Sequence, residues 1–433
     1  MSDDEKTLTV GLLGFGVVGS GVVRLLRDHV DEIAGRVGAR LVVGPVVVRD
    51  LDKQRDVDAL LTDDFAAVVG AAGVDVVVEV MGGIEPAREL LTQALKSGQS
   101  VVTANKELIA THGAELLVIA QEQSVRLEYE AAVAGAIPII KPMRESLAGD
   151  RVRKVLGILN GTTNYILTRM TEEGADLGPV LADAQELGYA EKPDPSADVD
   201  GHDAAAKTAI LASLAFDAEV TLDQVYTEGI RGVTAVDIAN AARMGYVIKL
   251  LGIAEEIEVD GGRSIGVRVH PAWVPADHPL ASVREAFNAI FIQADGAGEL
   301  MFYGRGAGSL PTASAVVGDV VTAARAHLAG EQLPRATITR KPIMPIDEAI
   351  VQYYVLLDVA DEAGVLATVA STFGDHDVSI KSVWQEGVGD HAQLLLVTHA
   401  AREGNVRACA EKLAGLGVVR SVASLMRVEG REV

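Results

Sequence analysis

The chain has 433 residues, of which 49% are apolar, and a formal net charge of −23, which argues against nucleic acid and against an anionic membrane as partners. Its single cysteine, Cys409, rules out a disulfide framework and a cysteine-rich metal site within one chain. The N-terminal residues MSDDEK lack an apolar signal-peptide core and no apolar run approaches the ~20 residues of a membrane span, so we expect a cytoplasmic protein.

Residues 7–150 alternate short apolar runs with segments of helical periodicity, which predicts a parallel sheet in a Rossmann-type doubly wound fold. The expected strands are TLTVGLLG, ARLVVGPVVVRD, VDVVVEVMGG, QSVVTANK and RLEYEAAVAGAIPII. The expected helices are SGVVRLLRDHVDEIAG, PARELLTQALKSG and ELIATHGAELLVIAQEQ. We assign residues 1–150 to this first domain.

The pattern changes at about residue 151. RVRKVLGILNGTTNYIL predicts a strand, a turn and the start of a helix, after which helices are expected to dominate to about residue 255. Strand-like segments such as RSIGVRVHPAWV follow, and residues 304–328 predict a glycine turn and a long helix. Residues 151–308 are therefore expected to form a second domain of α+β class.

The C-terminal part reads as a linker and a small domain. Residues 331–348 carry three prolines and no periodicity, as expected of a linker. Residues 349–433 alternate in the order βαββαβ, which is typical of a ferredoxin-like domain.

A glycine loop, VGLLGFGVVGSG, follows the first strand and opens the first helix. In Gly14-x-Gly16-x-x-Gly19 the first glycine permits a tight turn, the second lets the backbone approach a pyrophosphate, and the third lets the helix pack on the strand. The alternative is a glycine-rich turn of another parallel fold. Position and alternation favour a dinucleotide site, whose loop also includes Phe15, Val17 and Val18.

The tip of the second strand bears on cofactor choice. An acid there would bind the ribose 2′-hydroxyl of NAD, but here Arg49 precedes Asp50, and Lys53 and Arg55 follow. Basic groups suit a 2′-phosphate, so NADP is favoured and NAD stays possible. The alternative is that Arg49 is an exposed loop residue.

Two further stretches place polar groups at strand ends. TANKE puts Lys106 at the carboxyl edge of the sheet, where it could face a nicotinamide or a substrate carbonyl, or could simply begin the next helix at the surface. NGTTNYIL puts Asn160 to Thr163 ahead of a helix, either as an ordinary cap or as donors to a substrate carboxylate.

The segment GYAEKPDPSADVDGHDAAAK places five carboxylates ahead of Lys207. It is no EF-hand, because aligning Gly201 at position six puts Lys207 where a bidentate Glu is required. Asp203 and Lys207 lie four residues apart, on one helical face. A surface ion pair is the ordinary interpretation. The apolar residues all round the helix instead indicate burial, and a buried lysine beside a carboxylate can transfer a proton.

Taken together, these stretches resemble homoserine dehydrogenase in its long form with a C-terminal ACT domain. The resemblance covers most of residues 8–328 and rests on GLLGFGVVGSGV, TANKE, EAAVAGAIPII, LNGTTNYIL, GYAEKPDPSADVDGHDAAAK and GRGAGSLPTASAVVGD. It implies that Lys207 is the proton donor, that Asp203 is the acid beside it, and that Lys106 lies near the nicotinamide and the reacting oxygen. It also implies that residues 151–308 bind substrate, carry catalysis and dimerise.

The resemblance assigns the substrate residues as well. Glu191 matches the carboxylate that binds the amino group of homoserine, and Gly161, Thr162 and Tyr189 fall in substrate-lining segments. We add Asp198, from the same acidic loop, to this group. One departure stands out: where some members read YxEPDP, this chain has Lys192 inserted after Glu191.

Further positions follow from the same likeness. Glu130 and the carbonyls of Val133, Gly135 and Ile137 match a sodium site, which oxygen ligands suit. Gly308 matches a position on the cofactor side. The helix after it, at 309–330, completes the nucleotide-binding domain in this family.

The tail resembles an ACT domain, with Asp361 and Gly364 at the turn before its first helix. Such domains usually pair and bind an amino acid, which implies threonine as an inhibitor and a homodimer or homotetramer; the alternative is a tail that only assists dimerisation. The implied activity is NAD(P)-dependent interconversion of L-homoserine and L-aspartate 4-semialdehyde in threonine, methionine and isoleucine biosynthesis. Two alternatives remain open: an oxidoreductase of another small aldehyde, or a non-catalytic amino-acid sensor.

Overall fold

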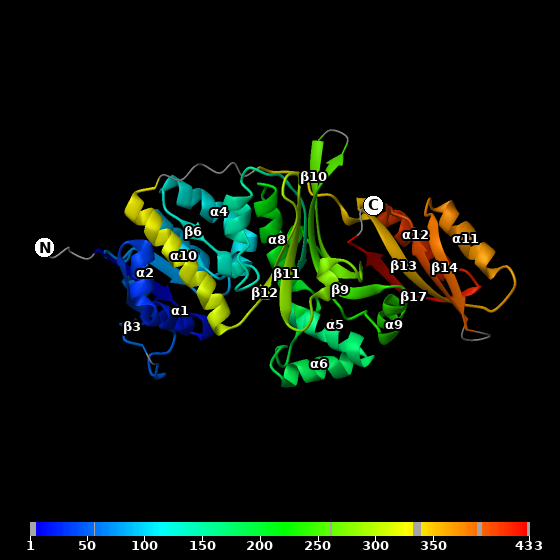
Figure 1. Cartoon of the computed structure of the whole chain (residues 1–433), viewed down its shortest axis with the longest axis horizontal. Coiled ribbons are helices and arrows are strands. Elements are labelled where there is room, and N and C mark those ends of the chain that lie inside the picture. Colours follow the sequence, from blue (N-terminus) through cyan, green and yellow to red (C-terminus); the bar gives the residue numbers. More distant parts are fainter. Residues whose placement is uncertain (1–5, 56, 260–261, 332–338, 388–391, 431–433) are drawn as a thin grey trace. The chain divides into compact units, whose positions relative to one another are not determined.

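The computed structural model describes residues 6–55, 57–259, 262–331, 339–387 and 392–430 (Figure 1). The chain divides into two compact units. The first comprises Met1–Gly161, Ala205–Val225 and Phe287–Lys341, and the second comprises Thr162–Ala204, Tyr226–Ala286 and Pro342–Val433. These units cut across the domain boundaries expected from the sequence, which stay a prediction.

The first unit contains the parallel sheet of a doubly wound fold, as predicted. Among the described residues its strands follow the order β3-β2-β1-β4-β5-β6, and every pair is parallel. The strands are β1 (Thr7–Leu13), β2 (Arg40–Val47), β3 (Leu61–Thr62), β4 (Val76–Glu79), β5 (Ser100–Thr103) and β6 (Leu127–Glu128).

One expectation for this sheet was wrong, and one short strand was not expected. The segment RLEYEAAVAGAIPII forms only the short β6 and then a 3-10 turn, η2 (Glu130–Ala132), because its carboxylates and glycine build a loop instead. The short edge strand β3 lies in a stretch with no expected strand, since two residues give no periodicity.

Helices α1 (Val17–Asp28), α2 (Val30–Val37) and α10 (Ser309–Ala329) share one apolar core with this sheet. Helices α3 (Ala87–Lys96) and α4 (Lys106–Glu122) contact β4, β5 and β6. The single helix expected over 20–35 is broken at His29, whose φ of −122° and ψ of 30° leave the helical range. Figure 1 shows α10, far along the chain, lying beside α1 and α2.

The first unit also holds an antiparallel group of strands and part of a buried helix. Strand β11 (Phe287–Ala294) pairs with β7 (Val152–Ile158) on one side and with β12 (Gly298–Arg305) on the other. Helix α8 (His202–Ala215) begins in the second unit and continues in the first.

The second unit combines helices with a long hairpin. Its helices are α5 (Gly161–Glu173, whose first residue belongs to the first unit), α6 (Leu177–Glu186), α7 (Ser196–Val199) and α9 (Ala235–Arg243). Strands β9 (Tyr246–Val259) and β10 (Gly262–Pro275) pair antiparallel, and β8 (Tyr226–Thr227) joins β10 in parallel. Helices were expected to about residue 255, which is wrong: an apolar run such as YVIKLLGIA does not by its periodicity distinguish a buried strand from a buried helix.

The C-terminal residues form the expected βαββαβ domain. Its elements are β13 (Ile350–Val359), α11 (Val365–Asp375), β14 (Ile380–Glu386), β15 (Gln393–Thr398), α12 (Glu403–Ala414) and β17 (Val419–Val428). The antiparallel order is β17-β13-β15-β14. The end of β17 also pairs in parallel with β10, at Ala272 with Arg427 and at Trp273 with Val428, so this domain shares a sheet with the hairpin.

The expected linker over 331–348 lies partly outside the described residues, at 332–338. Thr339 exchanges backbone hydrogen bonds with Asp217 and Glu219, at 3.0 and 2.9 Å, and Pro342 accepts one from Ile265 at 2.9 Å. The described remainder is therefore attached by strand-like pairing at each end. Within the described part of the chain, no helix combines the length and apolar character needed to cross a membrane.

Candidate functional site

The three glycines of the cofactor loop differ in what surrounds them. Gly14 adopts φ of +104°, and a Cβ there would lie 2.9 Å from the Val80 carbonyl. A Cβ on Gly19 would lie 2.5 Å from the Gly14 carbonyl, so α1 packs closely on the strand. A Cβ on Gly16 would meet nothing within 4 Å. Packing therefore explains Gly14 and Gly19, and Gly16 leaves open space where a pyrophosphate would approach.

Two helix N-termini come together beside this loop. Gly16 caps α1 and Gly308 caps α10, and neither helix has a side-chain cap or an acidic residue in its first turn. The Ser309 hydroxyl donates to the Val17 carbonyl at 2.8 Å, which joins the two ends. Uncapped N–H groups at helix N-termini bind phosphate, so these residues fit a dinucleotide. Val17 is exposed, and Phe15 and Val18 are half-buried.

The basic tip of the second strand is arranged as a small turn. Asp50 Oδ1 accepts hydrogen bonds from the backbone N–H groups of Asp52 and Lys53, at 2.9 and 3.3 Å. The Arg55 guanidinium donates to the Asp50 carbonyl at 2.6 Å. The Asp50 carboxylate thus accepts hydrogen bonds within its own turn, whereas Arg49 is exposed at the strand tip.

A buried carboxylate that was not predicted organises the carboxyl ends of β4 and β5. Glu79 is fully buried; it accepts from the Thr103 hydroxyl at 2.6 Å and from the Met81 N–H at 2.7 Å. Thr103 in turn accepts from the N–H of Asn105, whose side chain caps α4 at 3.1 Å. Lys106 is the first residue of that helix and is half-buried at the predicted sheet edge. In the sequence, this buried carboxylate was indicated by an acidic residue, Glu79, inside the otherwise apolar run VVVEV.

Lys207 is held in the interior of α8. Its side chain is 9% exposed, and the ammonium donates to the Leu159 carbonyl at 2.7 Å. The Asn288 amide donates to the same carbonyl at 2.8 Å. Asp203 lies one turn earlier on α8, in its first turn, and is also 9% exposed. The sequence predicted that Lys207 is buried, and the structure confirms this burial.

Close contacts connect Asn288 to the cofactor side within the first unit. A Cβ on Gly306 would lie 2.1 Å from the Asn288 amide nitrogen, and a Cβ on Gly135 would lie 2.4 Å from the Gly306 carbonyl. The Ala136 N–H donates to the Arg305 carbonyl at 3.1 Å. Since Gly308, two residues after Gly306, is the N-cap of α10, the segment that contacts Asn288 leads directly to the nucleotide-side helix.

The loop expected to hold sodium is rich in backbone oxygens. Ala134 and Gly135 are consecutive left-handed residues, with φ of 56° and 55°, which turns the chain sharply. Glu130 Oε1 accepts from the N–H groups of Ile139 and Ile140 at 2.5 and 2.7 Å. No cluster of three acidic, histidine or cysteine side chains suited to a metal occurs in the described residues. The predicted donors, the Glu130 carboxylate and the carbonyls of Val133, Gly135 and Ile137, are all oxygens, a set that fits a hard cation.

In the second unit, helix α5, which begins at Gly161 and not after Thr163 as expected, holds the start of the acidic loop. The Thr162 hydroxyl donates to the Tyr189 carbonyl at 2.6 Å, and the Tyr189 ring stacks on Tyr165 at 4.6 Å between centroids. Gly161 is the first residue of α5. The side chain of Glu191 is exposed, and its carbonyl accepts from Gln185 at 2.9 Å. Asp198 lies in the short α7, and Lys192 is exposed in the loop between.

A second buried lysine fixes α5, and the sequence did not identify it. The Lys249 ammonium on β9 donates to the Asn164 side chain at 3.0 Å and to the Val283 carbonyl. Burial lowers the pKa of Lys249 to about 8. Asn164 belongs to NGTTNYIL, so this contact positions the helix that holds Tyr189.

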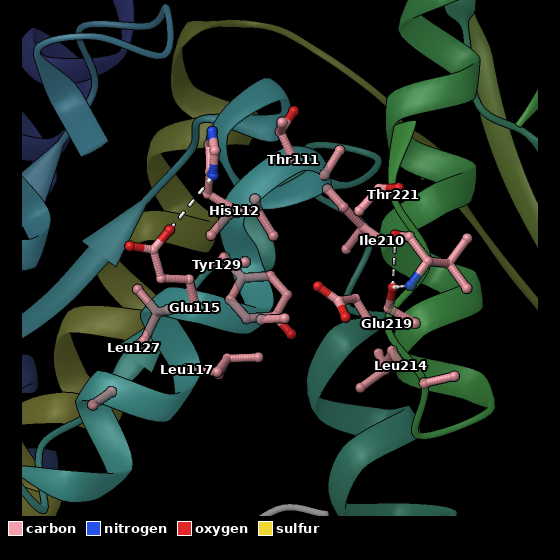
Figure 2. Close-up of a pocket in the computed structure, with 18 of the residues that line it drawn as sticks. Thr111, His112, Glu115, Leu117, Leu127, Tyr129, Ile210, Leu214, Glu219 and Thr221 are labelled. Atoms are coloured by element: carbon pink, nitrogen blue, oxygen red, sulfur yellow. Dashed lines mark hydrogen bonds and ion pairs between the residues drawn. The ribbon is translucent and has the colours of Figure 1, made fainter. Parts of the chain in front are cut away.

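The structure also has a cavity of about 400 Å³ that none of the predicted site residues lines. Figure 2 shows Thr111, His112 and Glu115 of α4 on one side and Ile210 and Leu214 of α8 on the other. The cavity lies against the second half of α8, past Lys207. The cavity is therefore separate from the residues of the candidate site.

Comparison with known proteins identifies the family. A curated homoserine dehydrogenase of Corynebacterium glutamicum is 50% identical over 424 residues, which cover 97% of this chain and 95% of that protein. The chain belongs to the homoserine dehydrogenase family. Residues 14–130 match the family described as "Homoserine dehydrogenase, NAD binding domain", residues 138–321 match "Homoserine dehydrogenase", and residues 353–417 match "ACT domain".

Solved structures of the homoserine dehydrogenase family agree with the fold. A homoserine dehydrogenase from Thiobacillus denitrificans has a TM-score of 0.93 at 40% identity, covering 98% of this chain and 99% of that one. The enzyme of S. aureus at pH 8.5 has a TM-score of 0.80 at 32% identity, covering 99% and 100%. The chain is thus an oxidoreductase with a nucleotide-binding domain and an ACT domain.

The open space at Gly16 gives a test that separates binding from folding. We predict that Gly16→Ala leaves the melting temperature unchanged and weakens binding of the nicotinamide dinucleotide by at least about 10-fold, because the methyl group would fill the space left for a pyrophosphate. Fluorescence titration with NADPH and a thermal melt measure both. Gly35→Ala on α2, where a Cβ also meets nothing within 4 Å, is the control and should bind normally. Normal affinity in Gly16→Ala would show that the pyrophosphate lies elsewhere.

Proposed function

We propose that the chain interconverts L-homoserine and L-aspartate 4-semialdehyde with NADP, and that Lys207 carries the proton. The observation that carries this proposal is the contact of the Lys207 ammonium with the Leu159 carbonyl. That carbonyl also binds Asn288, which packs against the segment leading into α10. The lysine is therefore held by residues that also lead to the cofactor side.

Oxidation of homoserine to the semialdehyde removes one hydride and one proton from the substrate. The glycine loop would hold oxidised NADP, which would supply the redox chemistry by taking the hydride released when the C–H bond of the homoserine carbinol carbon breaks. The hydroxyl proton passes to the Lys207 amine, and the carbonyl of the semialdehyde forms. In the reverse direction the Lys207 ammonium donates its proton to the developing alkoxide. Lys106 adds positive charge near the reacting oxygen, and Asp203 orients Lys207.

Substrate recognition is assigned to the acidic loop and the start of α5. Glu191 binds the substrate ammonium; its exposure and the attachment of its backbone to Gln185 suit a group that meets a ligand from solvent. Gly161, Thr162 and Tyr189 line the substrate, and the hydrogen bond from Thr162 to Tyr189 supports their joint placement. Asp198 contributes to the field of the same loop.

Cofactor preference is inferred from the tip of β2. The Asp50 carboxylate accepts backbone N–H groups of its own turn, whereas Arg49 is exposed, as a 2′-phosphate would require. A solved structure titled "Hyperthermophilic archaeal homoserine dehydrogenase mutant in complex with NADPH" supports this choice; it has a TM-score of 0.64 at 27% identity, covering 76% of this chain and all of that one.

The remaining assignments concern regulation and assembly. We infer that threonine binds the ACT domain and inhibits, in a pathway that supplies threonine, methionine and isoleucine. Gly364 supports a ligand turn: it caps α11 with φ of 96°. A sodium ion at Glu130 and the carbonyls of Val133, Gly135 and Ile137, and a homodimer or homotetramer, complete the proposal.

The proposed role of Lys207 predicts a specific loss. Lys207→Met should lower kcat for homoserine oxidation by about 10²–10⁴-fold, because no proton carrier remains, while NADP affinity stays within about twofold of wild type. Steady-state NADPH formation and a binding titration measure the two quantities. Lys96→Met, at the exposed end of α3, is the control. Near-normal turnover of Lys207→Met would refute the assignment.

The proposed role of Arg49 predicts a change of cofactor. Arg49→Gln should raise KM for NADP by about 10-fold and leave KM for NAD nearly unchanged, since it removes one charge-assisted contact to a phosphate. Arg40→Gln, at the exposed start of β2, is the control. Equal effects on both cofactors would place the 2′-phosphate away from Arg49.

A further inference from the structure

A short segment of the second unit, residues 226–231, runs between the ACT domain and the acidic substrate loop. Its first part is strand β8, in which Tyr226 and Thr227 pair with Arg268 and Val269 of β10. The Glu228 N–H donates to the Val269 carbonyl at 2.8 Å. The segment is therefore fixed to the same hairpin that pairs with the ACT strand β17.

Side chains of the ACT domain hold the first half of this segment. Arg427 of β17 pairs with Glu228 at 2.7 Å and donates to the Tyr226 hydroxyl at 3.2 Å. Arg407 of α12 donates to the same hydroxyl at 3.0 Å. Both guanidinium groups are bound in turn by Glu403, at 2.5 and 2.9 Å, and Glu403 is fully buried. Arg427 and Glu403 are buried, and separating buried paired charges is costly, so Glu228, itself 41% exposed, is bound to a charge pair that is fixed between β17 and α12.

The second half of the segment holds the substrate loop. The Ile230 N–H donates to the Val199 carbonyl at 2.8 Å. Arg231 pairs with the Asp200 carboxylate and donates to the Ser196 hydroxyl at 3.1 Å. The Arg231 guanidinium holds the pKa of Asp200 below its usual range. The loop that leads into α8 is thus fixed from outside by this half.

The backbone between the two ends packs closely against the substrate loop. A Cβ on Gly229 would lie 2.1 Å from the Val199 carbonyl and 2.4 Å from the Asp200 Cα. Glu228, held by the ACT domain, and Ile230, held by the loop, flank this contact. Displacement of one end is therefore passed to the other over a few residues.

We propose that residues 226–231 are the link through which the ACT domain sets the position of the substrate loop at 194–201. Glu228 and Arg231 act as positioning residues, since each fixes the loop through the segment. This inference rests on the proposed function and adds a route for its regulation. A ligand that shifts α12 or β17 would move Asp200, and with it the first turn of α8 that carries Asp203.

The link is tested by breaking each end. Glu228→Gln and Arg231→Met should each raise KM for homoserine by about 10-fold, while kcat changes less than about threefold and KM for NADP is unchanged. The KM of the double variant for homoserine should be no higher than that of the more strongly affected single variant, because both substitutions break the same connection. Arg231→Lys should restore part of the loss. Thermal melts of all variants check that each is folded.

A matched control exists on the same domain. Arg243 of α9 binds Glu386 of β14 with two hydrogen bonds, at 2.7 and 2.6 Å, and also ties the ACT domain to its neighbour without touching residues 226–231. Arg243→Gln should therefore leave KM for homoserine unchanged. Unchanged KM in Glu228→Gln, multiplied losses in the double variant, or an equal rise in Arg243→Gln would overturn the link. Wild-type chain with no homoserine oxidation would overturn the proposed function instead.

Discussion

The carbonyl of Leu159 is the point on which the arrangement of the first unit depends. Helix α8 is buried almost all round, so an ammonium group inside it must find acceptors, because burying an unpaired charge costs several kcal/mol. Leu159, just past the end of β7, supplies one, and Asn288 on β11 donates to the same oxygen. One oxygen therefore fixes a helix, a strand end and a neighbouring strand together, and it sets the direction in which the Lys207 amine can act.

Close contacts at two glycines connect Asn288 to the segment that leads to the nucleotide-side helix α10. Asn288 leaves no room for a side chain at Gly306, and Gly306 leaves none at Gly135. The carbonyl-rich turn at Ala134 and Gly135 thus packs against the strand end that leads to Gly308 and α10. A cation bound to that turn would stiffen the packing without taking part in the chemistry.

The sequence predicted what short-range patterns determine. Alternating apolar runs gave the parallel sheet and the βαββαβ order of the C-terminal domain, and the Ala-rich run after Asp203 gave the burial of Lys207. Long-range partners gave no such signal. The run YVIKLLGIA in β9 is apolar apart from Lys249 and shows no clear period, and its pairing with β10 identifies it as a strand. The pairing of β17 with β10 depends on two residues near the C-terminus.

The residues of the candidate site also form two groups: some stand in short sequence motifs, and others are lone polar residues with distant partners. Lys207, Asp203 and the cofactor glycines stand in motifs, and their roles stay predictions; the structure shows that Lys207 and Asp203 are buried and that Gly14 and Gly19 are closely packed. Glu79, Asn288 and Lys249 carry hydrogen bonds that hold those residues or their helices, yet each is a lone polar residue in an apolar stretch. A polar residue inside a buried strand indicates a partner but not which partner, since the partner lies far away in the chain.

The most direct measurement is the single-turnover rate of NADPH formation in Asn288→Leu, mixed as its NADP complex with homoserine. The substitution keeps the side-chain size and removes the amide from the Leu159 carbonyl. If that carbonyl positions Lys207, the rate should fall by about 10-fold or more, because small misplacement of a catalytic group is costly, and NADP affinity should be retained. A wild-type rate in a folded variant would contradict the account.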